Sequence, residues 1–435
     1  MDDDTIEPEA LAGYGGQAFD ECGSADFFER ARAEADYFNL CLRNGVNTFQ
    51  SHFSGAAGAT IDRGRCAEET SEGLNFGSQD YLSLNVHQAV HAAAKRAIDE
   101  QGVHSAGSAI LSGITDSALA LESELADFVQ MADVTIFPIG WAAGFGLITS
   151  LVRPDDHVVI DFLAHACLRQ GAASATKNVH PMPHLSLTHV ERCLKRIRAT
   201  DAKNGILVVT ETLFSMDSDV PDLVALQDIC RNYGATLFVD AAHDLGAIAP
   251  EGRGFLELQS LLGRVDIMMG AFSKSFAANG GFIASNEPAL KIRLRTGCGP
   301  STFTNASSPV QVAVVRAALQ VIRSQDGAER RRRLFNNAIY IRDRLTASGF
   351  DVLGEPSAIV PVILGDQAVS RLMTKYAVEH GVYVNLAEYP AVARNACRWR
   401  LQIMADHEKR HLDRFVEIAV KARDAAQSRL RSSAA

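Results

Sequence analysis

The sequence has no pair of closely spaced cysteines. Its 8 cysteines are scattered between Cys22 and Cys397 without a CxxC motif or a regular spacing, which argues against both a zinc site and a disulfide framework. We therefore expect no metal ligands, and reduced thiols of the kind found in cytoplasmic proteins. A basic and then apolar segment is also missing from the N-terminus, so the sequence gives no sign of secretion by a signal peptide.

The sequence has no excess of positive charge. The chain has 42 Lys and Arg residues against 52 Asp and Glu residues, for a formal net charge of -10. The longest basic block, Arg330 to Arg333, lies in a helical pattern and is expected to form an exposed helix face. Such a composition excludes nucleic acid as an expected partner.

Long apolar runs are few. Residues 135–152 are uncharged, but Pro138, Gly140 and Gly144 interrupt them. This pattern indicates a strand, a tight turn and the start of a buried helix rather than a membrane span. We expect no transmembrane segment, and a peripheral contact with a membrane stays open.

What the sequence does contain, from about residue 130 onward, is an alternation of short apolar runs with amphipathic segments. The runs VTIFP, HVVID, GILVVT, TLFVD, VDIMMG and GFIAS have the composition of strands covered on both faces. Their alternation with helical patterns predicts an α/β fold with a mostly parallel sheet.

The predicted organisation has three parts. Residues 1–70 are an N-terminal segment with a helix over about 26–45, and residues 71–305 are a large α/β domain. Residues 306–435 begin with long helical patterns, continue with short strands and end in a helix, so they are expected to form a smaller α+β domain.

One lysine stands out. Lys274 lies between Ser273 and Ser275, directly after the apolar run that ends near residue 271, and the strand-like TLFVD ends in Asp240 with His243 close behind. A buried lysine forms Schiff bases, and a carboxylate keeps a pyridine nitrogen protonated, so this combination indicates pyridoxal phosphate chemistry. Taken singly, Lys274 reads as a loop lysine, and Asp240 and His243 as an ordinary hydrogen-bonded pair.

Three further positions fit the same chemistry. Gly140 opens a helical pattern after a strand, where backbone N–H groups can bind a phosphate. His165 follows the strand HVVID, where its imidazole could lie over a cofactor ring, and Arg400 lies on a short C-terminal strand, where its guanidinium could bind a substrate carboxylate. Each has an ordinary structural explanation as well.

Together these segments resemble the α-oxoamine synthases, fold-type I pyridoxal phosphate enzymes that include serine palmitoyltransferase, 8-amino-7-oxononanoate synthase, 2-amino-3-ketobutyrate CoA ligase and 5-aminolevulinate synthase. The resemblance runs in order from residue 75 to about residue 415. It is carried by NFGSQDYLSL, HSAGSAILSGITDSALALESELADF, PIGWAAGFGLI, IDFLAHACLRQGA, TETLFSMDSDVPDL, VDAAHDLGAIAPEGRGF, GAFSKSFAANGGF, AIVPVILGD and YPAVARNACRWRLQIMADH.

The resemblance implies a role for each of these residues. Lys274 would hold the cofactor and later move the Cα proton of the substrate, and Asp240 would face the pyridine nitrogen. His243 would pair with the ring oxygen, His165 would stack on the ring, and Ser215 would lie near the ring oxygen.

The resemblance also implies how the phosphate and the substrate are bound. Gly140, Trp141 and Ser273 would hold the phosphate, aided by Thr304 of a second subunit, which implies a homodimer with shared active sites. Arg400 would bind the amino acid carboxylate.

Four positions depart from the family pattern. Ala271 replaces a threonine, Ala109 an arginine, and Ala164 an asparagine, while Ser308 takes the place of the first of two prolines. Cofactor binding should survive these changes, whereas they weaken any assignment of substrate from a single member of the family.

The implied activity is a decarboxylative Claisen-type condensation. An α-amino acid (serine, alanine or glycine) and an acyl thioester carried by coenzyme A or an acyl carrier protein would give an α-aminoketone, carbon dioxide and free thiol. Ser108 stands where glycine-specific members tend to carry threonine, which favours an amino acid with a side chain. A long acyl chain, as in serine palmitoyltransferase, is the first expectation, and a secondary metabolite or signalling aminoketone is the next.

Two other functions stay open at this point. One is a fold-type I aminotransferase or lyase, which shares the lysine and the aspartate but acts on no thioester. The other is a partner subunit without catalytic activity, against which Lys274, Asp240, His243 and Arg400 argue because all four are present.

Overall fold

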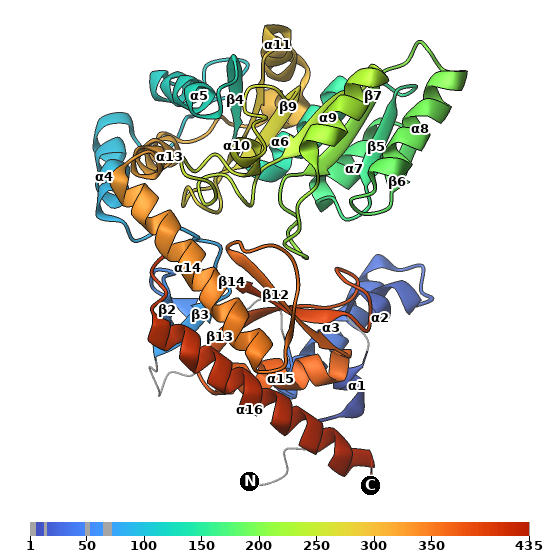
Figure 1. The fold of residues 1–435 in the computed structure, drawn as a ribbon, viewed down its shortest axis with the longest axis vertical. Helices are drawn as coiled ribbons and strands as arrows, with labels where there is room; N and C mark the ends of the chain where they lie inside the picture. Colours follow the sequence, from blue (N-terminus) through green and yellow to red (C-terminus); the bar gives the residue numbers. More distant parts are fainter. Residues whose placement is uncertain (1–5, 13–14, 48–52, 64–71, 435) are drawn as a thin grey trace. The chain divides into compact units, whose positions relative to one another are not determined.

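The computed structural model describes residues 6–12, 15–47, 53–63 and 72–434. The chain divides into two compact units (Figure 1), a smaller one of residues 1–78, 336–403 and 407–435 and a larger one of residues 79–335 and 404–406. Helix α14 (Gln325–Ala347) crosses the boundary between them. The division into 1–70, 71–305 and 306–435 stays a prediction.

The larger unit is built on one sheet with the strand order β4-β10-β9-β8-β7-β5-β6. All neighbours in the sheet are parallel except β10, which runs antiparallel to both β4 and β9. The mostly parallel α/β sheet expected from the apolar runs is confirmed. The strands are β4 (Asp133–Phe137), β5 (His157–Asp161), β6 (Val179–Met182), β7 (Ile206–Glu211), β8 (Thr236–Asp240), β9 (Ile267–Ala271) and β10 (Gly281–Ser285).

Helices cover both faces of this sheet, which explains why its strands carry no polar alternation. Val158 of β5 and Leu207 of β7 belong to a core cluster with residues of α6, α7 and α11. The next residue of each strand, Val159 and Val208, faces the other side, where it lies with residues of α8 and α9. The helices are α4 (Gln88–Gln101), α5 (Asp116–Val129), α6 (Gly140–Leu151), α7 (Ala166–Ala175), α8 (Leu187–Thr200), α9 (Leu223–Asn232), α10 (Phe255–Leu258), α11 (Pro288–Gly297), α12 (Gly299–Thr302) and α13 (Pro309–Ile322).

The uncharged run 135–152 forms most of β4 and all of α6, as predicted. No helix in the described part of the chain is both long and apolar enough to span a membrane. The seven cysteines within that part are free thiols, and Cys66 lies outside it.

The smaller unit holds a second sheet of order β1-β2-β3-β13-β14-β12-β11. Only β3 and β13 pair in parallel, so residues from the two ends of the sequence share one sheet. The predicted N-terminal helix is present as α3 (Phe27–Arg43). The other elements are α1 (Pro8–Leu11), α2 (Gly15–Glu21), β1 (Phe53–Ser54), β2 (Thr60–Arg63), β3 (Glu72–Phe76), β11 (Asp351–Val352), β12 (Ile359–Gly365), α15 (Gln367–Glu379), β13 (Val382–Ala387), β14 (Cys397–Gln402) and α16 (Lys409–Ala434).

The basic block on α14 corrects one expectation. Arg331 is buried with 7% of its surface exposed, and its guanidinium donates hydrogen bonds to the carbonyl oxygens of Ile322 and Pro250, each at 2.7 Å. The block is therefore not one exposed face. The predicted helix is present, but Arg331 points inward because its guanidinium binds the carbonyl oxygen of Ile322, the last residue of α13.

Candidate active site

The candidate site lies at the carboxyl edge of the larger sheet, where β5, β7, β8 and β9 all end. Asp240 is the last residue of β8 and lies in register with Glu211, the last residue of β7. The chain then reaches Lys274 three residues after β9. Because the carboxyl ends of parallel strands meet at one edge, Asp240 and Lys274 come from neighbouring strands to the place where α/β sheets bind ligands.

Charge couples these residues. Asp240 has only 5% of its surface exposed, and burial raises the pKa of its carboxyl, while the positive charges of Lys274 and His165 and a hydrogen bond from the Ala242 N–H act in the opposite direction. The Ala242 nitrogen lies 2.9 Å from Oδ1 of Asp240. A buried carboxyl of this kind gains from a cationic neighbour such as a protonated ring nitrogen.

Lys274 lies in a tight loop between β9 and β10. The loop is closed by a hydrogen bond of 2.9 Å from the Phe272 N–H to the Gly280 carbonyl, and Gly280 has a φ of 122°, which disfavours any other residue there. Lys274 is half-buried and Ser273 is exposed. Ser275 is buried, packs toward Gly246, and its Oγ has no hydrogen-bond partner within the described residues.

The N-terminus of α6 lies against this loop. A Cβ atom on Gly281 would stand 2.8 Å from the Cα of Gly140, and a Cβ atom on Gly140 would stand 3.1 Å from that of Ala271. The N-cap residue of α6, Ile139, supplies no side-chain hydrogen bond to the helix. First-turn N–H groups of a helix without a side-chain cap suit an anion such as phosphate.

Two aromatic residues meet beside this helix end. The indole of Trp141, 40% exposed, meets the imidazole of His165 edge to face, with ring centroids 5.9 Å apart and an interplanar angle of 73°. His165 is the N-cap residue of α7 and accepts a hydrogen bond from the Cys167 N–H at 3.3 Å. Trp141 and His165, predicted from separate stretches of sequence, therefore lie together.

Two residues that the sequence analysis did not single out complete the arrangement. The hydroxyl of Tyr81 lies 2.8 Å from Nδ1 of His243. The carboxyl of Glu211 accepts a hydrogen bond of 2.6 Å from the His165 N–H, and burial together with the neighbouring Asp240 raises its pKa well above the ordinary value. Tyr81 lies in NFGSQDYLSL and Glu211 in TETLFSMDSDVPDL. Both stretches carry the family resemblance, so both residues could have been singled out from the sequence.

The structure also describes the four remaining predicted residues. Ser215 is half-buried in the loop that follows β7. Ser108 forms an isolated β-bridge with Asn305, which brings its segment beside Thr304. Arg400 lies on β14 of the smaller unit, in register with Asn385. The roles of Ser215, Ser108, Thr304 and Arg400 stay predictions.

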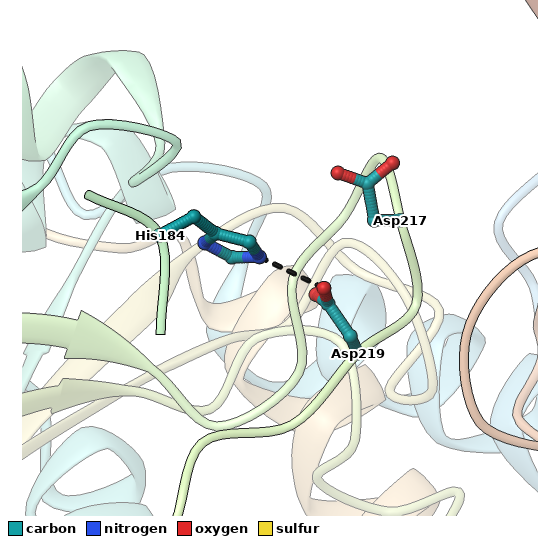
Figure 2. A group of neighbouring side chains, drawn as sticks. All are labelled: His184, Asp217 and Asp219. Carbon is teal, nitrogen blue, oxygen red and sulfur yellow. Dashed lines mark hydrogen bonds and ion pairs between the residues drawn. The ribbon is translucent and has the colours of Figure 1, made fainter. Parts of the chain in front are cut away.

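A cluster of three side chains lies further along the same edge (Figure 2). Ligand-type atoms of His184, Asp217 and Asp219 lie within 4.8 Å of one another, an arrangement that the cysteine pattern had given no reason to expect. Burial opposes a charge on His184, but hydrogen bonds with Asp161 and Asp219 outweigh it and raise the pKa of His184 to about 10. At neutral pH the imidazole is therefore a cation that pairs with the carboxylates of Asp161 and Asp219.

Comparison with known proteins identifies the family of the chain. A family model described as aminotransferase class I and II matches residues 71–418. The 8-amino-7-oxononanoate synthase of Geobacter sulfurreducens is 33% identical over 352 residues, which cover 81% of this chain and 89% of that protein. This chain belongs to the α-oxoamine synthase family.

Other α-oxoamine synthases match over similar lengths. The 2-amino-3-ketobutyrate coenzyme A ligase of Salmonella typhimurium is 32% identical over 79% of this chain and 86% of its own length. A putative 8-amino-7-oxononanoate synthase 2 of Mycobacterium tuberculosis is 32% identical over 90% of this chain, which spans only 49% of that relative.

Solved structures of α-oxoamine synthases share the fold. The serine palmitoyltransferase of Sphingomonas wittichii superposes with a TM-score of 0.86 at 26% identity, covering 93% of this chain and all of that one. A structure of SPT with PLP as an internal aldimine gives a TM-score of 0.86 at 28% identity, covering 92% of this chain and 99% of that one. The fold-type I architecture predicted from the sequence is thereby confirmed.

Proposed function

We propose that this α-oxoamine synthase uses pyridoxal phosphate to condense an α-amino acid with an acyl thioester, releasing carbon dioxide, free thiol and an α-aminoketone. The observation that carries the proposal is that the buried carboxyl of Asp240 and the positive charge of Lys274 interact electrostatically at the carboxyl edge of the sheet. The family of the chain supports the reaction class.

The residues present fit the cofactor. The N–H groups at the start of α6, at Gly140 and Trp141, would hold its phosphate, with the exposed hydroxyl of Ser273 as a further donor. Asp240 would face the ring nitrogen, His243 the ring oxygen, and His165 one face of the ring. When bound, the cofactor supplies an electron-poor ring that accepts the electron pair left at the substrate Cα.

Lys274 would carry out the proton transfers. Its amine would bind the cofactor covalently at rest, then remove the proton from Cα of the amino acid and return one after carbon dioxide has left. Its half-buried position beside a buried carboxyl limits competition from water. Asp240 would keep the ring nitrogen protonated throughout, because water hardly solvates its buried carboxylate and a protonated nitrogen would balance the charge.

His243 and His165 would position the ring. The hydrogen bond between Tyr81 and Nδ1 of His243 holds that imidazole in one orientation, in which it would face the cofactor oxygen. The Glu211 carboxyl fixes the backbone of His165, and Trp141 supports its imidazole from the side. Positioning of this kind decides which bond at Cα breaks.

For the substrates we propose serine, alanine or glycine as the amino acid, bound through its carboxylate by Arg400, and a long-chain acyl group on coenzyme A or an acyl carrier protein. The small side chain of Ser108 leaves room for a substrate side chain. A homodimer that contributes Thr304 across its interface would complete the phosphate site.

The decisive experiment follows the visible absorption of the purified protein during titration with glycine, alanine, serine and threonine, with and without a long-chain acyl-CoA. A cofactor band that shifts with one amino acid, together with thiol and carbon dioxide release on addition of the thioester, is the expected result. Lys274→Ala should lower the rate of thiol release by at least about a thousandfold, because it removes the catalytic base.

Controls separate the alternatives. Lys203→Ala, at an exposed loop position, should leave the rate unchanged. Amino group transfer to a keto acid without thiol release would instead identify an aminotransferase, and a protein that takes up no pyridoxal phosphate at all would be a binding subunit. Full activity of Lys274→Ala would refute the mechanism.

A further inference from the structure

His184 connects three neighbouring strand ends of the larger sheet. It lies two residues after β6, and its Nδ1 is 3.0 Å from both carboxylate oxygens of Asp161, the last residue of β5. Its Nε2 is 2.8 Å from Oδ2 of Asp219, in the loop that follows β7 (Figure 2). Because β6, β5 and β7 are adjacent in the sheet, one imidazole spans the ends of all three.

The Asp161 end of this bridge holds the segment that leads to His165. The carboxylate of Asp161 accepts hydrogen bonds of 2.9 Å from the N–H groups of both Leu163 and Leu185, and its carbonyl accepts one of 3.0 Å from the Ala164 N–H. Asp161 is 8% exposed and four residues from His165. The direction in which His165 enters the site therefore depends on how Asp161 is held.

The Asp219 end holds the loop that carries Ser215. The carbonyl of Asp219 accepts a hydrogen bond of 3.0 Å from the Phe214 N–H, and the Phe214 carbonyl accepts one of 2.9 Å from the Ser218 N–H. The Phe214 ring meets the His184 ring edge to face at 4.5 Å. Ser215 is thus enclosed between two anchored residues of a short turn.

We propose that His184 is a positioning residue of the active site: as a cation shared by Asp161 and Asp219, it fixes the loop of His165 and the loop of Ser215 relative to each other. The inference rests on the proposed function, because those two loops matter only if they hold the cofactor ring. An imidazolium serves here because it donates from both nitrogens at once, which no neutral histidine tautomer can do.

The test compares His184 with a second histidine of the same sheet, His157. His157, at the opposite end of β5, also pairs with an aspartate, Nε2 to Oδ2 of Asp201 at 3.1 Å, and is 13% exposed against 17% for His184. His184→Gln and His157→Gln therefore each remove a histidine that contacts an aspartate, at opposite edges of the sheet. For each variant we would measure the melting temperature without cofactor, the Kd for pyridoxal phosphate, and the visible circular dichroism of the bound cofactor.

Both variants should lower the melting temperature. Only His184→Gln should raise the Kd for pyridoxal phosphate, by about tenfold, which is the loss of one charged hydrogen bond, and only it should change the circular dichroism of the bound cofactor. Equal effects of the two variants on Kd and circular dichroism would overturn the proposal and leave His184 a structural residue.

A second variant guards against a His184→Gln protein that does not fold. Asp219→Asn keeps the pair between His184 and Asp161 but weakens the link to the Ser215 loop, so it should shift the circular dichroism of the cofactor with little loss of stability. An unchanged spectrum in Asp219→Asn would count against the bridge. Wild-type protein that binds no pyridoxal phosphate would instead refute the proposed function itself.

Discussion

The hydroxyl of Tyr81 and Nδ1 of His243 lie 2.8 Å apart, and both side chains are almost fully buried. Tyr81 precedes His243 by 162 residues, yet this contact fixes the orientation of the imidazole. The pair therefore links an early segment of the chain to the aspartate and histidine at the end of β8.

Replacement of that tyrosine tests the link. Tyr81→Phe should destabilise the protein by about 1 kcal/mol, the typical net value of a buried hydrogen bond, and should also weaken binding of pyridoxal phosphate because His243 loses its orientation. Tyr340→Phe is the matched control, since the Tyr340 hydroxyl bonds to Asp413 at 2.6 Å in the smaller unit. Denaturant unfolding measures the stability of both variants, and titration with pyridoxal phosphate measures their affinity for the cofactor. Equal cofactor affinities of Tyr81→Phe and Tyr340→Phe would contradict the role of Tyr81 in orienting His243.

Asp240→Asn should separate catalysis from folding. The substitution removes the charge proposed to face the ring nitrogen, and we expect a fall in kcat of about 10²–10³-fold. Since burial of the Asp240 carboxyl raises its pKa, the neutral amide should not lower stability at neutral pH. The control is Asp266→Asn. The Asp266 carboxylate accepts a hydrogen bond from the Leu237 N–H at the opposite end of β8, so this variant should have a lower melting temperature and an unchanged kcat in steady-state kinetics.

Gly281→Ala should disturb the phosphate site. The added methyl would stand 2.8 Å from both Gly140 Cα and the Gly270 carbonyl oxygen, which are backbone atoms that have to shift as a unit. We expect weaker binding of pyridoxal phosphate, measured by absorption titration. Gly23→Ala, where no atom lies within 4 Å of the new methyl, should bind the cofactor as the wild type does.

The pH dependence of stability should report the charge of His184. Its pKa is raised to about 10 by Asp161 and Asp219, above the unfolded value of about 6.5. A raised histidine pKa means that the stabilisation is complete below pH 6.5 and is lost as the pH rises toward 10. The difference in unfolding free energy between wild type and His184→Gln should therefore shrink between those limits in urea titrations, whereas a constant difference would show that His184 is neutral.

A buried ion pair in the smaller unit offers a test of folding. The guanidinium of Arg371 lies 2.7 Å from Oε1 of Glu388, and the two side chains are 2% and 1% exposed. The same guanidinium donates a hydrogen bond of 2.7 Å to the carbonyl oxygen of Ala10. Glu388→Gln leaves the arginine without its counter-charge and should cost about 3–5 kcal/mol. The double variant Arg371→Met, Glu388→Met should recover most of that loss in denaturant unfolding, and no recovery would contradict the argument.

Arg371 also anchors the N-terminal helices, because Ala10 belongs to α1 and the hydroxyl of Tyr37, on α3, lies 2.6 Å from the same guanidinium nitrogen. We expect the Arg371→Met variant to be cleaved faster by protease near its N-terminus than wild type. Mass spectrometry of the fragments would show whether cleavage falls before α3.

Much of the fold could be read from local patterns. Uninterrupted apolar runs predicted the parallel strands, since strands covered on both faces carry no polar alternation. Pro138 and Gly140 correctly marked the turn into α6. Asp240 and Lys274 were recognisable because Asp240 ends such a run and Lys274 lies three residues after another, which places both at the carboxyl edge of the sheet.

Contacts between distant segments could not be read in the same way. Nothing around Tyr81 points to His243, and nothing around His184 points to Asp219, because hydrogen bonds of side chains across strands depend on strand order rather than on sequence spacing. The burial of Arg331 was missed for a similar reason: its partners, the carbonyls of Ile322 and Pro250, include one from a remote loop.

The sequence by itself determined where strands and helices form, which residues stand at the strand ends, and to which family the chain belongs, because each depends on the order of residues along the chain. Only the tertiary structure decided that β6, β5 and β7 lie side by side in that order. That adjacency lets one imidazole, His184, reach two carboxylates from separate loops. The two carboxylates that the fold brings to this imidazole, and not the local sequence, make His184 a cation despite its burial.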